Sequence, residues 1–118
     1  MSPIDFSAFP WIPPWQAVSA RGREAYDHEL RLEVSPGHPL YEVRASAVAR
    51  TCHGDDVLFQ LHDHSAALAV VHLTFRGRPE QEVKWPSVTL YKTLDQWIMR
   101  GMLRDAARYE IDESNQAA

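Results

Sequence analysis

The sequence predicts a single α+β domain, in which an antiparallel sheet of about four strands is flanked by an N-terminal and a C-terminal helix. Its length of 118 residues is that of one domain with one sizeable core. Residues 55–75 contain two apolar runs separated by a short polar turn, as in two adjacent strands. After Thr93, a helix-capping pattern precedes apolar residues at helical spacing. These observations determine the predicted fold class.

The first sixteen residues are rich in both proline and aromatic residues. The prolines disfavour a helix or a central strand. We therefore expect residues 1–16 to form an extended arm that buries its rings on the domain. The alternative is a partner-binding segment of polyproline type, in which Trp11 and Trp15 are candidate contact residues.

Residues 17–34 carry two periodicities. Positions four apart, from Val18 to Val34, follow the helical period, and Ser19 is a suitable N-cap. Residues 29–34 also alternate between apolar and charged side chains, as a strand does. The length of the segment and its Glu, Arg and Leu content favour the helix. The Ser-Pro-Gly-His-Pro sequence at 35–39 then ends it.

Four strands are predicted after this turn, at residues 41–51, 57–62, 67–75 and 87–91. A turn at residues 53–55 separates the first strand from the second. The third run is apolar on both faces, which indicates a position inside the sheet.

The last helix is predicted to begin at Thr93, whose hydroxyl can accept from a helical amide while Gln96 reaches back. Its apolar residues recur at helical spacing, at Leu94, Trp97, Ile98, Met102 and Ala106. We expect Trp97 and Trp85 to lie in the core. Residues 112–118 are polar or small and are expected to form a frayed tail.

Composition argues against several classes of protein. A nucleic-acid-binding protein normally carries a basic patch, whereas this chain has a net charge of −4 and a pI of about 5.8. No apolar run approaches the roughly 20 residues of a membrane span. The single cysteine, Cys52, precludes an internal disulfide and fits a reducing compartment, so we expect a cytoplasmic protein. Homo-oligomerisation stays open.

Three short motifs resemble a group of small, uncharacterised bacterial proteins. They are SPGHPL at 35–40, DDVLF at 55–59 and VVHLTF at 70–75. In that group a pGHpL turn precedes a DDVLF strand and a VHLTW strand. This chain has Phe75 at the position of the group's tryptophan. The resemblance covers roughly residues 25–105 and implies a bacterial, cytosolic α+β domain without bringing any activity with it.

Three histidines of the central hairpin are weak candidates for a metal site. His62 and His64 share one face if their strand extends that far, and His72 belongs to the next strand. Three imidazoles are a ligand set that a catalytic zinc ion uses. The hairpin lacks the helical His-x-x-x-His spacing and the cysteine pairs of strong zinc motifs. The alternative is that His62 and His64 are solvated turn residues and His72 a core histidine. We expect no metal ion and no cofactor.

Two turns carry further candidate binding residues. Asp55 and Asp56 lie beside His53, and carboxylates next to an imidazole can perform acid–base chemistry. The same residue types are typical of a turn in which aspartates bond backbone amides. His38, held in the rigid turn between the two prolines of 36–39, is a candidate ligand contact if it is exposed.

A row of arginines follows one side of the last helix, at Arg100, Arg104 and Arg108. Like charges at this spacing repel one another slightly, so helix stability does not explain them. Asp105 and either Glu80 or Glu82 are candidates to neutralise the row. The alternatives are a solvated face and a contact with an acidic partner or another anion.

The sequence contains no Gly-rich phosphate loop, GxSxG elbow, CxxC or HExxH motif. We therefore expect a non-enzymatic domain of the accessory or immunity type that binds another protein. The alternative is a small enzyme or metal-binding protein that uses the histidines and aspartates of the hairpin. No catalytic residue is assigned.

Overall fold

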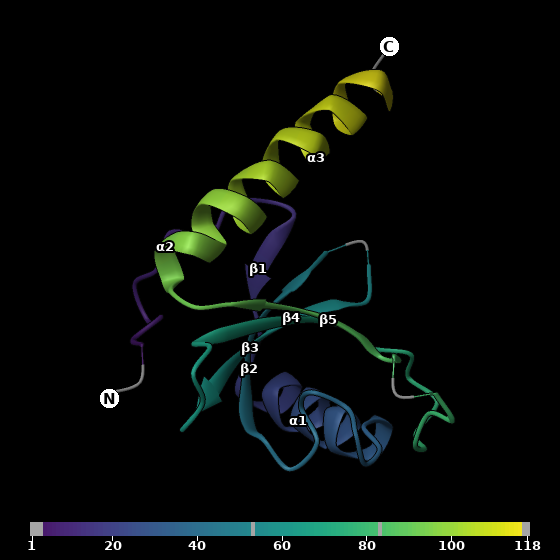
Figure 1. Ribbon diagram of the computed structural model, residues 1–118. Helices are drawn as coiled ribbons and strands as arrows, with labels where there is room; N and C mark the ends of the chain where they lie inside the picture. Colours follow the sequence, from purple (N-terminus) through teal and green to yellow (C-terminus); the bar gives the residue numbers. More distant parts are fainter. Residues whose placement is uncertain (1–3, 53, 83, 117–118) are drawn as a thin grey trace.

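The computed structural model describes residues 4–52, 54–82 and 84–116. Its centre is a five-stranded antiparallel sheet in which each strand pairs with the next one along the chain. Helix α1 (Ala20–Glu33) lies on one face of the sheet, and the C-terminal helix lies on the other (Figure 1). The predicted α+β class, with a helix from each end of the chain, is therefore confirmed.

The strands are β1 (Trp15–Ala17), β2 (Arg44–Thr51), β3 (Asp56–His62), β4 (Leu68–His72) and β5 (Ser87–Tyr91). The prediction of about four strands omitted β1, which lies in the proline-rich arm. This strand forms because it begins directly after Pro14 and lies at the edge of the sheet, where it pairs only with the end of β2. The interior position predicted for β4 is confirmed, since this strand lies between β3 and β5.

Two strands are shorter than predicted. β2 begins at Arg44 rather than at residue 41, because Glu42 has a φ of 62°, which belongs to a turn. β4 ends at His72 rather than at residue 75. The amides of Thr74 and Phe75 donate to the carboxylate of Glu33 on α1 and not to a neighbouring strand.

Helix α1 confirms the helical interpretation of the ambiguous segment through Glu33. The Oγ of Ser19 accepts a hydrogen bond from the amide of Gly22 at 3.0 Å, as an N-cap does. The carboxylate of Asp27 accepts from the amide of Ala47 at 2.7 Å and so attaches the helix to β2. Residues 29–33 therefore alternate in sequence without forming a strand, and of their two leucines Leu30 belongs to the buried core while Leu32 is only partly buried.

The C-terminal helix comprises α2 (Leu94–Trp97), a π-turn (Ile98–Met102) and α3 (Leu103–Gln116). Its predicted cap is confirmed, since Thr93 Oγ1 accepts from the amide of Gln96 at 3.1 Å. In a capping box the Gln96 side chain would accept from the amide of the N-cap residue, Thr93. Here it accepts from the amide of the preceding residue, Lys92, at 2.7 Å. The helix also continues through residues 112–116, where we expected a frayed tail.

The sheet buries an apolar cluster on each face. The cluster beneath α1 includes Leu30, Leu40, Val57, Phe59, Leu61 and Val71. The cluster beneath the C-terminal helix includes Trp15, Leu58, Leu68, Tyr91, Trp97 and Met102. Successive residues of β3 alternate between the two clusters, as the two-residue period of a strand requires.

Candidate functional site

The outer face of the C-terminal helix carries a row of exposed apolar side chains. Met99 is 68% exposed, Leu103 41% and Ile111 62%. Ala107, also exposed, occupies the position between the last two. Side chains four residues apart lie on the same side of a helix. These four residues therefore form one continuous stripe, which we call the apolar row.

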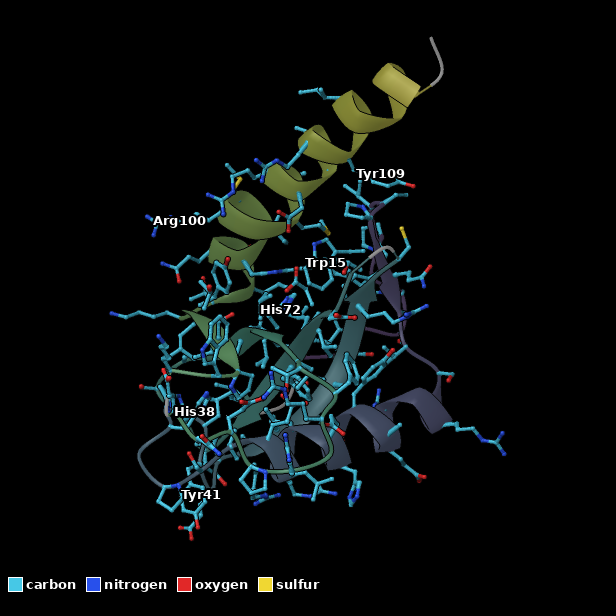
Figure 2. The ribbon with its side chains drawn as sticks, turned by 90° about the vertical axis from the view of Figure 1, so that its right-hand side faces the viewer. Trp15, His38, Tyr41, His72, Arg100 and Tyr109 are labelled. Atoms are coloured by element: carbon cyan, nitrogen blue, oxygen red, sulfur yellow. The ribbon has the colours of Figure 1, made fainter. Side chains whose placement is uncertain are left out.

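The three arginines of the same helix form a second row beside it, the arginine row. Each arginine follows a member of the apolar row by one residue, which places it about 100° further around the helix axis. Arg100, Arg104 and Arg108 are all exposed, and the Arg100 side chain projects away from the helix (Figure 2). The outer face of the helix is thus apolar along one line and positively charged along the next.

The acidic residues that we expected to neutralise the arginine row lie elsewhere. Glu80 and Glu82 pair with basic residues of their own loop, at N–O distances of 3.7 and 3.1 Å. Asp105 accepts a hydrogen bond from the indole Nε1 of Trp15 at 2.9 Å, toward the sheet. Within the described residues, no ion pair joins the arginine row to a carboxylate.

The packing of the inner face directs both rows toward solvent. Trp97, Met102 and Ala106 are buried against the sheet and the arm. The π-turn between them brings Gly101 directly against the indole of Trp97. A Cβ at Gly101 would lie 2.8 Å from that ring, which is too close for a real side chain. This glycine therefore leaves the room that the Trp97 ring occupies against its own helix.

The arm supplies packing, and its tryptophans are not available as a free binding surface. Trp15 is 2% exposed and lies between the sheet and the C-terminal helix (Figure 2). Trp11 is partly buried, with its ring centroid 6.0 Å from that of Trp97. The first alternative for the arm, burial of its rings on the domain, is therefore the one that the geometry supports.

His38 is a structural residue, not an exposed ligand contact. Only 5% of it is accessible. Its Nδ1 accepts from the amide of Leu40 at 3.0 Å, so Nε2 carries the ring proton and donates to the carbonyl of Pro86 at 2.8 Å. The sequence suggested exposure because the turn is polar, but the turn folds its imidazole inward to connect two loops.

Asp56 and His72 do come together. They are opposite each other on β3 and β4, with 3.0 Å between a carboxylate oxygen and Nδ1. His72 was expected to lie in the core, but it is exposed, because it is the last residue of β4 and lies at the end of the strand. His72 and Asp55 line an open depression of about 360 Å³. His53 lies outside the described residues.

The three candidate metal ligands do not converge. His62 is six residues from Asp56 along β3 and therefore about 20 Å from the end of the sheet where His72 lies. His62 bonds Ser46 at 2.9 Å, and the Nδ1 of His64 accepts from a turn amide at 2.9 Å. Among the described residues, no group of three histidine, cysteine or acidic side chains is placed to hold a metal ion.

Zinc binding tests this arrangement directly. We expect no binding in the micromolar range when zinc is titrated into the protein at neutral pH and followed by calorimetry, because no three ligands in the described part of the chain can reach one ion. His72→Ala should give the same trace as the wild type. Micromolar binding that His72→Ala abolishes would contradict this and would favour the metal-binding alternative.

No family model, curated protein or solved structure matches this chain. Its function must therefore be inferred from its own geometry and charge. In the described part of the chain, none of the helices combines the length and apolar content that crossing a membrane would need. Among the described residues, the two rows of the C-terminal helix form an exposed surface that packing within the domain does not explain.

Two features of this structure were not predicted from the sequence. The apolar row has a signal in the sequence, four apolar residues at intervals of four, but the buried residues of the same helix have a similar helical spacing. The second feature is Glu33, a fully buried carboxyl group. Its Oε1 accepts from the amide of Thr74 at 2.8 Å, and its Oε2 accepts from the amide of Phe75 at 2.8 Å. No sequence motif announces this contact, which joins α1 to the segment after β4.

A proton on Glu33 completes its hydrogen bonds. The Thr74 hydroxyl lies 2.9 Å from Glu33 Oε1 and 2.7 Å from Glu80 Oε1, yet it has one hydrogen to donate. If Glu33 is protonated, it donates to the Thr74 oxygen, and the Thr74 hydroxyl donates to Glu80. Burial, together with a hydrogen bond with Glu29, raises the pKa of Glu33 to about 7. Glu33 is thus a structural acid within α1.

Proposed function

We propose that this protein is a non-enzymatic protein-binding domain, of the accessory or immunity type, that contacts its partner through the outer face of the C-terminal helix. The observation that carries the proposal is the apolar row. Three of its side chains are large and are 41–68% exposed along one line. Single exposed apolar residues are ordinary on protein surfaces, but a contiguous stripe is typical of an interaction site.

The energetics of the row favour a partner. Burying one large aliphatic side chain completely contributes roughly 1.5–3 kcal/mol. Met99, Leu103 and Ile111 leave a large part of that contribution unrealised in the isolated chain. Helices of this kind bind by laying apolar residues at intervals of three or four into a groove of another protein. The C-terminal helix is suited to this, because α3 extends past the edge of the sheet (Figure 1).

The arrangement of polar residues gives less support to an enzyme. The Asp56–His72 pair is exposed and lies about 20 Å from His62, the third member of the constellation that the alternative requires. Both tryptophans of the arm pack against the domain. We also propose a cytosolic location, since the one cysteine fits a reducing compartment.

Site-specific photo-cross-linking in cells of the source organism tests this function. A photoreactive phenylalanine analogue is placed at Ala107, which is exposed within the apolar row. We expect one discrete adduct with another protein. The double substitution Leu103→Ser and Ile111→Ser should abolish this adduct while leaving the circular dichroism melt unchanged, because both side chains lie on the surface.

Leu90→Ser is the matched control. Leu90 on β5 is 42% exposed, almost the same as Leu103 at 41%, but it lies away from the helix. The adduct at Ala107 should persist in this variant. The absence of any adduct, or equal loss in the double variant and in Leu90→Ser, would contradict a specific binding role for the helix.

A further inference from the structure

We infer that the partner of the C-terminal helix presents an apolar groove with an acidic rim along one side. This inference rests on the proposed function and specifies the chemistry of the partner. The apolar row would fill the floor of the groove, and the arginine row would face the rim. The two rows run in parallel along the same stretch of helix, from residue 99 to residue 111, so one partner surface can engage both.

The charges of the arginine row are the first argument. Three guanidinium groups lie on one line of a protein whose net charge is −4. Among the described residues, the three carboxylates that we expected to neutralise them, of Glu80, Glu82 and Asp105, have other partners. Repulsion between neighbouring arginines is slightly unfavourable in the free chain and is relieved when carboxylates approach. Arginine also binds carboxylates with two parallel hydrogen bonds, which favours a protein rim over a diffuse negative field.

A second copy of this chain fits the surface poorly. The apolar row covers 13 residues, less than two heptads, and residues 112–116 that continue the helix are polar in sequence. A self-sufficient two-helix pairing usually needs three or four heptads. In an antiparallel pair the two arginine rows would also face each other. The chain therefore lacks both the length and the charge pattern for self-association through this helix.

A lipid surface fits less well than an acidic protein groove. A membrane-bound amphipathic helix is rich in basic residues across its polar face. Here the arginines occupy one flank of the apolar row, and the exposed Glu110 lies on the other flank, one residue before Ile111. The acidic chain as a whole would also be repelled by anionic lipids. One-sided basic charge matches a groove with one acidic rim.

The experiment measures the yield of the Ala107 adduct in charge variants. We expect Arg104→Glu to lower the yield at limiting partner concentration by roughly fivefold to tenfold, because an attraction becomes a repulsion. Arg104→Lys, which keeps the charge, should retain most of the yield. Arg21→Glu, which reverses an exposed arginine on α1, should leave the yield unchanged. In a cell lysate, high salt should reduce the wild-type yield and abolish the difference between wild type and Arg104→Glu.

The outcomes separate this inference from the function on which it rests. An adduct that survives Arg104→Glu, but that Leu103→Ser with Ile111→Ser abolishes, would overturn the acidic rim and leave the protein-binding function intact. An adduct between two copies of this chain would overturn both. Co-sedimentation of the protein with phosphatidylserine vesicles, lost in Arg104→Glu, would assign the helix to a membrane and would also overturn the inference.

Discussion

Replacing Trp97 with alanine should lower the free energy of unfolding by about 3–5 kcal/mol, the range for truncating a buried aromatic side chain. Trp97 is 0% exposed and is the largest fully buried side chain of the protein. Its ring meets that of Trp15 at 5.5 Å in an edge-to-face contact. The indole Nε1 has no hydrogen-bond partner among the described atoms, so the loss is one of packing.

Denaturant unfolding followed by far-ultraviolet circular dichroism measures this effect. Trp85→Ala is the control. Because Trp85 is 41% exposed, this substitution should lower the free energy of unfolding by only about 0.5 kcal/mol. The pair also tests a correction made by the structure, since the sequence predicted both tryptophans to be in the core. A Trp97→Ala protein as stable as the wild type would mean that the C-terminal helix is not anchored through this ring.

Replacing Glu33 with alanine should cost about 2–4 kcal/mol, because it leaves two backbone amides of the segment after β4 without acceptors. These amides, of Thr74 and Phe75, lie 2.8 Å from the two carboxyl oxygens. Glu24 is the matched control, since it lies on the same helix but is exposed. Equal stability of Glu33→Ala and Glu24→Ala in urea melts would show that the buried carboxyl does not hold this segment.

The same carboxyl should make stability depend on pH. Its pKa is raised from 4.5 to about 7 on folding, so the folded state retains the proton more tightly than the unfolded state. The resulting stabilisation is complete below pH 4.5 and is lost as the pH rises to about 7. The full change is roughly 3 kcal/mol, since one pKa unit corresponds to about 1.4 kcal/mol.

Urea melts between pH 4 and pH 8 measure this dependence against Glu33→Gln, which has no titrating group at this position. We expect the stability of the wild type, relative to that of Glu33→Gln, to be highest at low pH. This relative stability should fall as the pH rises, until the variant equals or exceeds the wild type. Glu24→Gln should follow the wild-type curve throughout. A wild-type curve parallel to that of Glu33→Gln would refute the raised pKa.

Local signals were sufficient where one element's own residues decide its structure. The Thr93 cap and the apolar spacing after it predicted the start of the C-terminal helix, and the apolar alternation of residues 57–62 predicted β3. The end of β4 could not be predicted in this way. It depends on Glu33, which lies 41 residues earlier in the chain and takes the amide of Thr74 as its donor.

In the candidate site, too, some features follow from the local sequence and others depend on residues that are distant in the chain. The spacing of the arginine row was readable from the sequence, and so was the chemistry that it offers. Whether the row was already neutralised depended on where Glu80 and Asp105 lie, and no local pattern contains that information. His38 was expected to be exposed and His72 to be buried, and the structure shows the reverse. His38 bonds the carbonyl of Pro86, 48 residues away, and His72 lies at the end of β4, which depends on the contacts of Glu33.

The order of the strands has a consequence for how the chain assembles. Because each strand pairs with the next, the sheet can form one hairpin at a time, and each pairing closes only a short loop. The contact between Trp15 and Asp105 spans 90 residues and is completed only when the last helix exists. During synthesis the aromatic arm is therefore made well before the Trp97 side chain that covers it. The rings of Phe9 and Trp11 can pack on each other during this interval, but their contacts with Trp97 form only after the sheet has been made.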